Sequence, residues 1–125
     1  MGEIRNFFFD TYAFIEIVKE NKNYEPYKKN IGIVTTIFNL MELHYSLLRT
    51  VGKAEADKHF DRLLSFIIEI PKEVIKEANH FKLINRKKRL SYVDCIGYIF
   101  SKRMGIKFLT GDNQFKDFEN AEFVK

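Results

Sequence analysis

This sequence of 125 residues contains one cysteine, two prolines and no tryptophan. The single cysteine, Cys95, excludes an intramolecular disulfide scaffold. The three histidines do not cluster with it, so no Cys and His pattern suggests a zinc site. No hydrophobic run approaches the roughly 18 residues that a membrane span requires, and the apolar residues 7–9 are too few for a signal-peptide core. We therefore expect a cytoplasmic protein without membrane association.

The overall composition is typical of a globular protein. Hydrophobic residues make up 46% of the chain and aromatic residues 15%, which excludes a disordered chain. The length predicts a single domain over residues 1–125. The net charge of +4 is compatible with an anionic partner but does not identify one.

Short apolar runs alternate along the chain with segments of helical periodicity. We predict strands at residues 5–9, 31–35, 66–70 and 107–110, and a last edge strand at 122–124. We predict helices at residues 11–21, 24–29, 36–51, 53–64, 71–88, 92–104 and 113–118. Strands that are apolar on both faces and joined by helices indicate a parallel sheet that is covered on both sides. The predicted fold class is therefore α/β, a three-layer α/β/α domain with a short parallel central sheet.

Four acidic residues stand where such a fold places its functional site. Asp10 and Asp112 follow the first and fourth predicted strands. Ligands of parallel α/β folds bind at the carboxyl ends of the strands, so both acids belong to that edge. Asp94 lies in the first turn of the 92–104 helix, and Glu42 lies in the helix that follows the second strand.

Each acid also has a purely structural interpretation, which is favoured when the acid is considered alone. Asp10 and Asp112 stand at positions typical of helix N-caps or turns, and Ser91 and Asp94 have the spacing of a capping box. Glu42 shares a polar helical stripe with Thr35, Asn39, Ser46 and Arg49. That stripe could simply face water.

Convergence of the four carboxylates would instead indicate a metal site. Two carboxylates about 5 Å apart repel by roughly 3 kcal/mol at an effective dielectric constant of about 20. Either their pKa values rise or a divalent cation binds among them. Oxygen ligands suit Mg²⁺ or Mn²⁺, and such sites commonly hydrolyse phosphodiesters.

The four acids, in this order and context, resemble those of the PIN domain family, and at this length the VapC-like toxin ribonucleases. The resemblance covers nearly the whole chain, through residues 9–11, 35–42, 90–95 and 110–115. The last segment is the most specific, because Thr110, Asp112 and Phe115 fit a Thr-x-Asp-x-x-Phe pattern.

The resemblance implies a Mg²⁺- or Mn²⁺-dependent endoribonuclease that hydrolyses RNA with a metal-activated water. It implies the metal ligands Asp10, Glu42, Asp94 and Asp112, with Glu42 bound directly or through water. Apart from the resemblance, Thr110 and Thr11 are candidates for orienting ligand waters or contacting a phosphate, and we count Thr110 among the catalytic residues. The resemblance also implies a homodimer and, for the toxin branch, a cognate antitoxin.

A basic run, Arg86, Lys87, Lys88 and Arg89, stands shortly before Asp94. Cations are favoured near a helix C-terminus, so the run could be a solvated helix end. It could also contact RNA phosphates, and its position next to Asp94 favours this second interpretation.

The other residues with reactive or stacking side chains have no motif. We expect Cys95 to pack in the core. The histidines are expected at the surface or half-buried; they are His44, His59 and His80. Core packing is also the expectation for the aromatic residues that could otherwise stack on bases; they are Tyr12, Phe14, Tyr45 and Tyr92.

Other functions remain open at this point. A phosphotransferase of the haloacid dehalogenase type is disfavoured, because that family requires a second Asp two positions after the first, where this chain has Tyr12. A PIN-like RNA-processing nuclease outside a toxin system and a non-catalytic PIN-like interaction module are the alternatives. Chelator-sensitive cleavage of RNA would distinguish a nuclease from a binding module.

Overall fold

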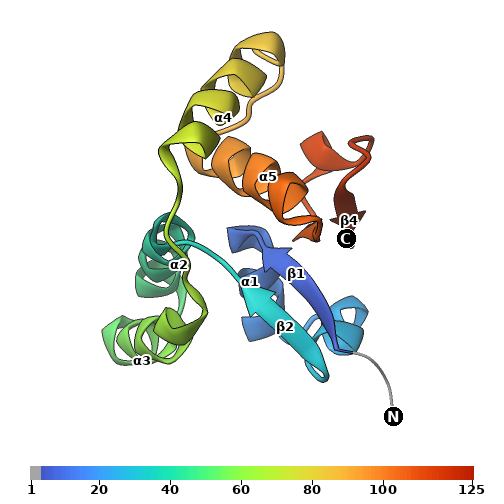
Figure 1. Cartoon of the computed structure of the whole chain (residues 1–125). Coiled ribbons are helices and arrows are strands. Elements are labelled where there is room, and N and C mark those ends of the chain that lie inside the picture. Colours follow the sequence, from blue (N-terminus) through green and yellow to red (C-terminus); the bar gives the residue numbers. More distant parts are fainter. Residues whose placement is uncertain (1–3) are drawn as a thin grey trace.

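The central sheet has four strands, all parallel, in a computed structural model that describes residues 4–125. Its order is β2 (Ile31–Val34), β1 (Arg5–Phe9), β3 (Lys107–Thr110) and β4 (Ala121–Phe123). Parallel pairing confirms the predicted α/β class, and Figure 1 shows the strands with helices packed around them. Residues 1–3 of the predicted single domain lie outside the described residues.

Helices cover the sheet in two groups. One group comprises α1 (Thr11–Val18), the 3₁₀ helix η1 (Lys22–Tyr27), α2 (Ile37–Thr50) and α3 (Lys53–Leu63). The other comprises α4 (Lys72–Ile84), α5 (Tyr92–Met104) and the 3₁₀ turn η3 (Asn113–Phe115). Each group contributes to its own buried hydrophobic cluster.

Strand β1 supplies both clusters because successive side chains of a strand point to opposite faces. Phe7 and Phe9 pack with α1 and α2, whereas Phe8 packs with α5. The approach of α5 depends on Gly97, where an added Cβ would lie 2.8 Å from the ring of Phe8 and 2.9 Å from the ring of Phe108. The buried β1 therefore holds its carboxyl end, and Asp10, in a rigid setting.

The strand predicted at 66–70 is wrong. Residues Leu64–Phe66 form a 3₁₀ turn, η2, and only Ile67 makes a bridge, to Thr35. The reason lies in β2, which leaves only Thr35 for further pairing before Thr36 caps α2. The segment crosses from one face of the sheet to the other. Ile67 packs against the hydrophobic cluster formed with α1, α2 and α3 (the α2 cluster), and Ile68 packs against the cluster formed with α4 and α5 (the α5 cluster).

Several helices end earlier than predicted. Helix α1 ends at Val18, because Glu20 adopts a left-handed conformation with a φ of 58°. Helix α4 ends at Ile84, where the side chain of Asn85 donates to the carbonyl of Phe81. The basic run at 86–89 is therefore a loop between α4 and α5 rather than the last turn of a helix. Similarly, the helix predicted at 113–118 is only the short η3.

Two smaller expectations concern the core and the membrane. Cys95 is buried in the α5 cluster, as predicted, and burial raises the pKa of its thiol to about 11. Among residues 4–125 no helix has both the length and the apolar character needed to cross a bilayer.

Candidate functional site

Asp10 is the buried centre of the carboxyl edge of the sheet. It follows β1, only 3% of its surface is exposed, and it caps α1, with Oδ1 accepting from the backbone N–H of Thr11 at 2.8 Å. Its Oδ2 accepts from the hydroxyl of Thr110 at 2.7 Å. Burial, together with the nearby carboxylates of Asp94 and Glu42, raises the pKa of Asp10 to about 8 against the opposing hydrogen bonds from Thr110 and Thr11. The N-cap interpretation is correct, but a cap alone does not require this burial.

Thr110 connects two of the four acids. The same hydroxyl that donates to Asp10 accepts from the backbone N–H of Asp112 at 3.1 Å. Asp112 in turn caps η3, with Oδ1 accepting from the backbone N–H of Gln114 at 3.0 Å. The end of β3 and the end of β1 are thus joined by one buried hydroxyl.

Glu42 contacts Thr11, the residue after Asp10, and does not simply face bulk water. Its Oε1 accepts from the hydroxyl of Thr11 at 2.8 Å, and the side chain is half-buried. Burial raises the pKa of Glu42, the hydrogen bond from Thr11 opposes that shift, and the carboxylate of Asp94 adds to it. The interpretation of Glu42 as a solvent-facing helix residue is therefore wrong.

Asn39 shows why the first turns of that stripe are covered, whereas Arg49 at its end is exposed. Its amide Nδ2 donates to the hydroxyl of Thr11 at 3.2 Å, and its Oδ1 accepts from the hydroxyl of Thr36 at 2.6 Å. Sequence reasoning placed Asn39 on the polar stripe but gave it no role. The spacing of three residues from Glu42, one helical turn, was the signal that the two would face the same neighbour.

Asp94 serves as a helix cap and also faces the other acids. Its Oδ2 accepts from the backbone N–H of Ser91 at 2.9 Å, and its own N–H donates to the hydroxyl of Ser91 at 3.0 Å, which confirms the capping box. Burial raises the pKa of Asp94, the bonds from Ser91 oppose the shift, and the charge of Asp112 adds to it. Asp94 can therefore stabilise the start of α5 and also interact with the other three acids.

The four acids form one electrostatic group. Asp94 acts on the pKa of Asp10 and of Glu42, and Asp112 acts on that of Asp94. As the side chains stand in residues 4–125, no three or more His, Cys, Asp or Glu are arranged to hold a metal ion. The donor chemistry nevertheless fits a hard divalent cation, because the acids are oxygen ligands whose mutual repulsion a cation would relieve.

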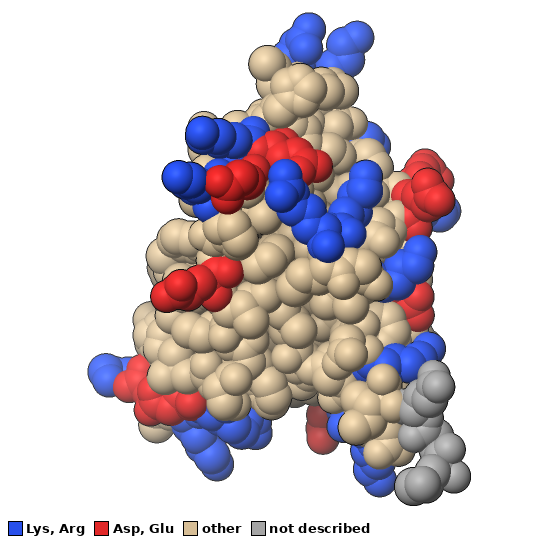
Figure 2. All heavy atoms as spheres, viewed as in Figure 1, with Lys and Arg blue, Asp and Glu red and all other residues tan. Residues whose placement is uncertain are grey.

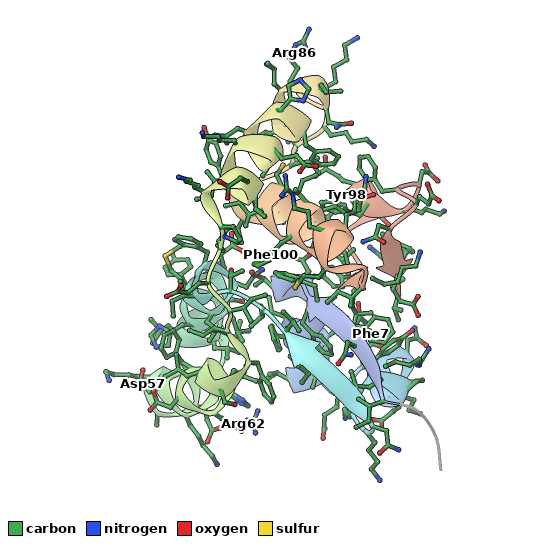
Figure 3. The ribbon with its side chains drawn as sticks, in the orientation of Figure 1. Phe7, Asp57, Arg62, Arg86, Tyr98 and Phe100 are labelled. Atoms are coloured by element: carbon green, nitrogen blue, oxygen red, sulfur yellow. The ribbon has the colours of Figure 1, made fainter. Side chains whose placement is uncertain are left out.

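The basic run lies at the tip of α4, where Figure 3 labels Arg86. All four of its side chains are exposed. The backbone of Arg89 is held by the side chain of Gln114, whose Nε2 donates to the Arg89 carbonyl at 2.8 Å and whose Oε1 accepts from the Arg89 N–H. Gln114 therefore ties the basic loop to the segment that carries Asp112, a role that the sequence did not reveal.

Only some of the four aromatic residues expected to pack in the core do so. Phe14 is buried and Tyr12 is half-buried, but Tyr45 and Tyr92 are 64% and 66% exposed, so core packing was the wrong expectation for these two. His44 pairs with Asp57 at 2.7 Å, on α2 and α3.

The model of the PIN domain family matches residues 7–121 of the chain. The chain belongs to the PIN domain family. Solved structures with the same fold include the toxin VapC20 of Mycobacterium tuberculosis, which is described as cleaving the sarcin–ricin loop. The VapC20 structure aligns with a TM-score of 0.76 and 18% identity, over 95% of this chain and 99% of the VapC20 chain.

Two further structures share the PIN fold. VapBC2 from Rickettsia felis, bound to a DNA fragment from its promoter, aligns with a TM-score of 0.69 and 18% identity over 96% of this chain and 99% of that one. A toxin–antitoxin complex from Klebsiella pneumoniae aligns with a TM-score of 0.70 and 13% identity over 91% and 93%. No curated protein sequence matches the chain. At these identities the structural likeness shows a common fold.

Proposed function

We propose that this PIN domain is a Mg²⁺- or Mn²⁺-dependent endoribonuclease and the toxin of a VapBC-type toxin–antitoxin pair. The observation that carries the nuclease proposal is the joining of Asp10 to Asp112 through Thr110, with Glu42 joined to the same edge through Thr11. Hydrogen bonds that orient carboxylates are typical of the surroundings of metal ligands.

In this proposal Asp10, Glu42, Asp94 and Asp112 hold the cation. A bound Mg²⁺ or Mn²⁺ supplies a Lewis acid that activates water and stabilises the leaving oxygen of a phosphodiester. Thr110 fixes the orientation of the Asp10 carboxyl, and Thr11 does the same for Glu42. The basic loop at 86–89 supplies positive charge that attracts the RNA backbone toward these acids.

The toxin assignment rests on the solved relatives and on an exposed apolar face. The structures that share the fold include a toxin described as cleaving the sarcin–ricin loop and a toxin–antitoxin complex. Apolar side chains recur at helical spacing on the outer face of α2 and are 39–64% exposed; they are Ile37, Phe38, Met41, Tyr45 and Leu48. Figure 2 shows a broad uncharged area across the middle of the molecule, between charged groups above and below. Exposed apolar surface of this kind favours protein partners, here a second copy of the chain and a cognate antitoxin.

The nuclease proposal is tested by incubating the purified protein with structured RNAs in Mn²⁺ or in EDTA. We expect internal cleavage in Mn²⁺, none in EDTA, and none by the Asp10→Asn variant in either. Asp117→Asn, which changes an exposed acid after η3, is the matched control and is expected to cleave normally. Cleavage that persists in EDTA or in Asp10→Asn would contradict the proposal.

A further inference from the structure

A cavity of about 360 Å³ opens between the C-terminal half of α4 and the start of α5. Its lining is Asn79, Lys82, Leu83, Arg86 and Tyr92. Two cations, an amide, an apolar side chain and an aromatic ring offer contacts to a phosphate, to a base edge and to a base face. Nothing in the fold requires this combination at the surface.

Tyr92 is the feature that packing does not explain. Its side chain is 66% exposed, whereas Tyr98 on the same helix is buried within the aromatic cluster of α5. The ammonium of Lys82 lies 5.0 Å from the centre of the Tyr92 ring and is held in place by donating to the carbonyl of Leu90 at 2.7 Å. The ring is therefore supported from the side of α4 and still presents most of its surface to solvent.

The cavity is adjacent to the acidic group. Ser91, the residue before Tyr92, donates its backbone N–H to Oδ2 of Asp94 at 2.9 Å. Lys82, which lines the cavity, donates to the carbonyl of Leu90, the residue before Ser91, at 2.7 Å. Arg86, the first residue of the basic loop at the tip of α4, lines the cavity. A ligand in the cavity would thus lie between the basic loop and the turn that holds Asp94.

We propose that this cavity binds one unpaired nucleotide of the RNA substrate, with its base stacked on Tyr92 and its phosphate contacted by Arg86. Asn79 offers an amide to the edge of the base, and Lys82 supports the ring from behind. The inference rests on the proposed nuclease function and deepens it, because a base stacked on Tyr92 must be free of a complementary strand.

Tryptophan fluorescence provides a direct test, because the chain has no tryptophan of its own. Tyr92→Trp introduces one reporter in the cavity, and Tyr45→Trp introduces one at a tyrosine of similar exposure on α2. Tyr45 is a close match, since it also has a cation over its ring, the guanidinium of Arg49 at 5.8 Å. Titration with a short single-stranded RNA in EDTA should quench the fluorescence of Tyr92→Trp and leave that of Tyr45→Trp unchanged.

Affinity measurements in EDTA give the second arm. Tyr92→Ala should weaken binding of the same RNA by about 5- to 150-fold, whereas Tyr92→Phe, which keeps the stacking face, should bind like the wild type. An RNA with one abasic nucleotide at the contacted position should remove the difference between the wild type and Tyr92→Ala. Circular dichroism melting curves confirm that each variant is folded.

The outcomes separate this inference from the proposed function. If the wild type cleaves RNA in Mn²⁺ but Tyr92→Ala binds and cleaves equally well, the nucleotide site is overturned and the nuclease stands. Equal quenching of both tryptophan reporters also overturns the site. If the wild type neither binds nor cleaves RNA, the proposed function is overturned and the nucleotide site with it.

Discussion

The hydroxyl of Thr110 donates a 2.7 Å hydrogen bond to Oδ2 of Asp10, across 100 residues of sequence. Both residues are buried, and the same hydroxyl accepts the backbone N–H of Asp112. The side chain of Thr110 therefore fixes both the carboxyl group of Asp10, at the end of β1, and the backbone of Asp112.

Thr110→Val should impair metal binding. Valine keeps the shape of threonine but leaves Asp10 without its hydroxyl partner, so we expect Mn²⁺ affinity or cleavage to fall by about 10- to 100-fold. Thr110→Ser keeps the hydroxyl and should retain most of the activity. Mn²⁺ affinity by calorimetry and single-turnover cleavage measure the effect. Equal activity of the valine and serine variants would contradict the role of the hydroxyl.

Stability without divalent cation should fall as the pH rises from about 4 to about 8. Burial raises the pKa of Asp10 from 3.8 to about 8, so over this range the folded state binds a proton that the unfolded state releases. The free energy of unfolding then decreases by up to about 1.4 kcal/mol per pH unit. The raised pKa values of Glu42 and Asp94 act in the same direction.

Urea unfolding in EDTA at several pH values measures this slope. Asp10→Asn has no titrating group at the position and should show a flatter profile, while Asp117→Asn should follow the wild type. A wild-type stability that rises between pH 5 and pH 8 would contradict the assignment of the raised pKa.

Binding of Mn²⁺ should release protons. Because the pKa of Asp10 is about 8, its carboxyl is largely protonated at pH 7 in the absence of cation. A carboxylate ligand must be deprotonated, so we expect about one proton released per binding event at pH 7 and fewer above pH 8. Calorimetry in buffers of different ionisation enthalpy gives this number, and a value near zero at pH 7 would be inconsistent with Asp10 as a ligand.

The capping and metal roles of Asp94 can be separated. Asp94→Asn keeps an acceptor for the N–H of Ser91, so it should abolish cleavage with little change in melting temperature. Ser91→Ala removes the cap and should cost about 0.5–2 kcal/mol of stability while cleavage persists. Full activity in Asp94→Asn would reduce Asp94 to a helix cap.

The basic loop should contribute to the salt dependence of RNA binding. Replacing Lys87 and Arg89 together by Gln should make the slope of log affinity against log salt shallower by about 1.4, for two lost phosphate contacts on a single strand. The control replaces Lys22 and Lys58, exposed lysines on η1 and α3, and should leave the slope unchanged. An unchanged slope in the Lys87 and Arg89 variant would return the loop to a merely solvated surface.

Local patterns in the sequence were sufficient for much of the fold. The apolar runs at β1 and β3 and the capping box at Ser91 depend on neighbouring residues only, so they could be predicted. The order of the acids along these elements was predictable for the same reason. The strand at 66–70 failed because its apolar run resembles a buried strand, while pairing requires a partner backbone that β2 does not provide beyond Thr35.

The sequence by itself determined the α/β class, the parallel sheet and the positions of the four acids along the strands and helices, because hydrophobic periodicity and capping are local properties. Only the tertiary structure decided that Thr110 reaches Asp10, that Thr11 reaches Glu42 and that Tyr92 is exposed above a cavity. These contacts join residues far apart in sequence, and their geometry depends on how the helices pack on the sheet. Burial has the same origin, and burial is the main cause of the raised pKa of Asp10.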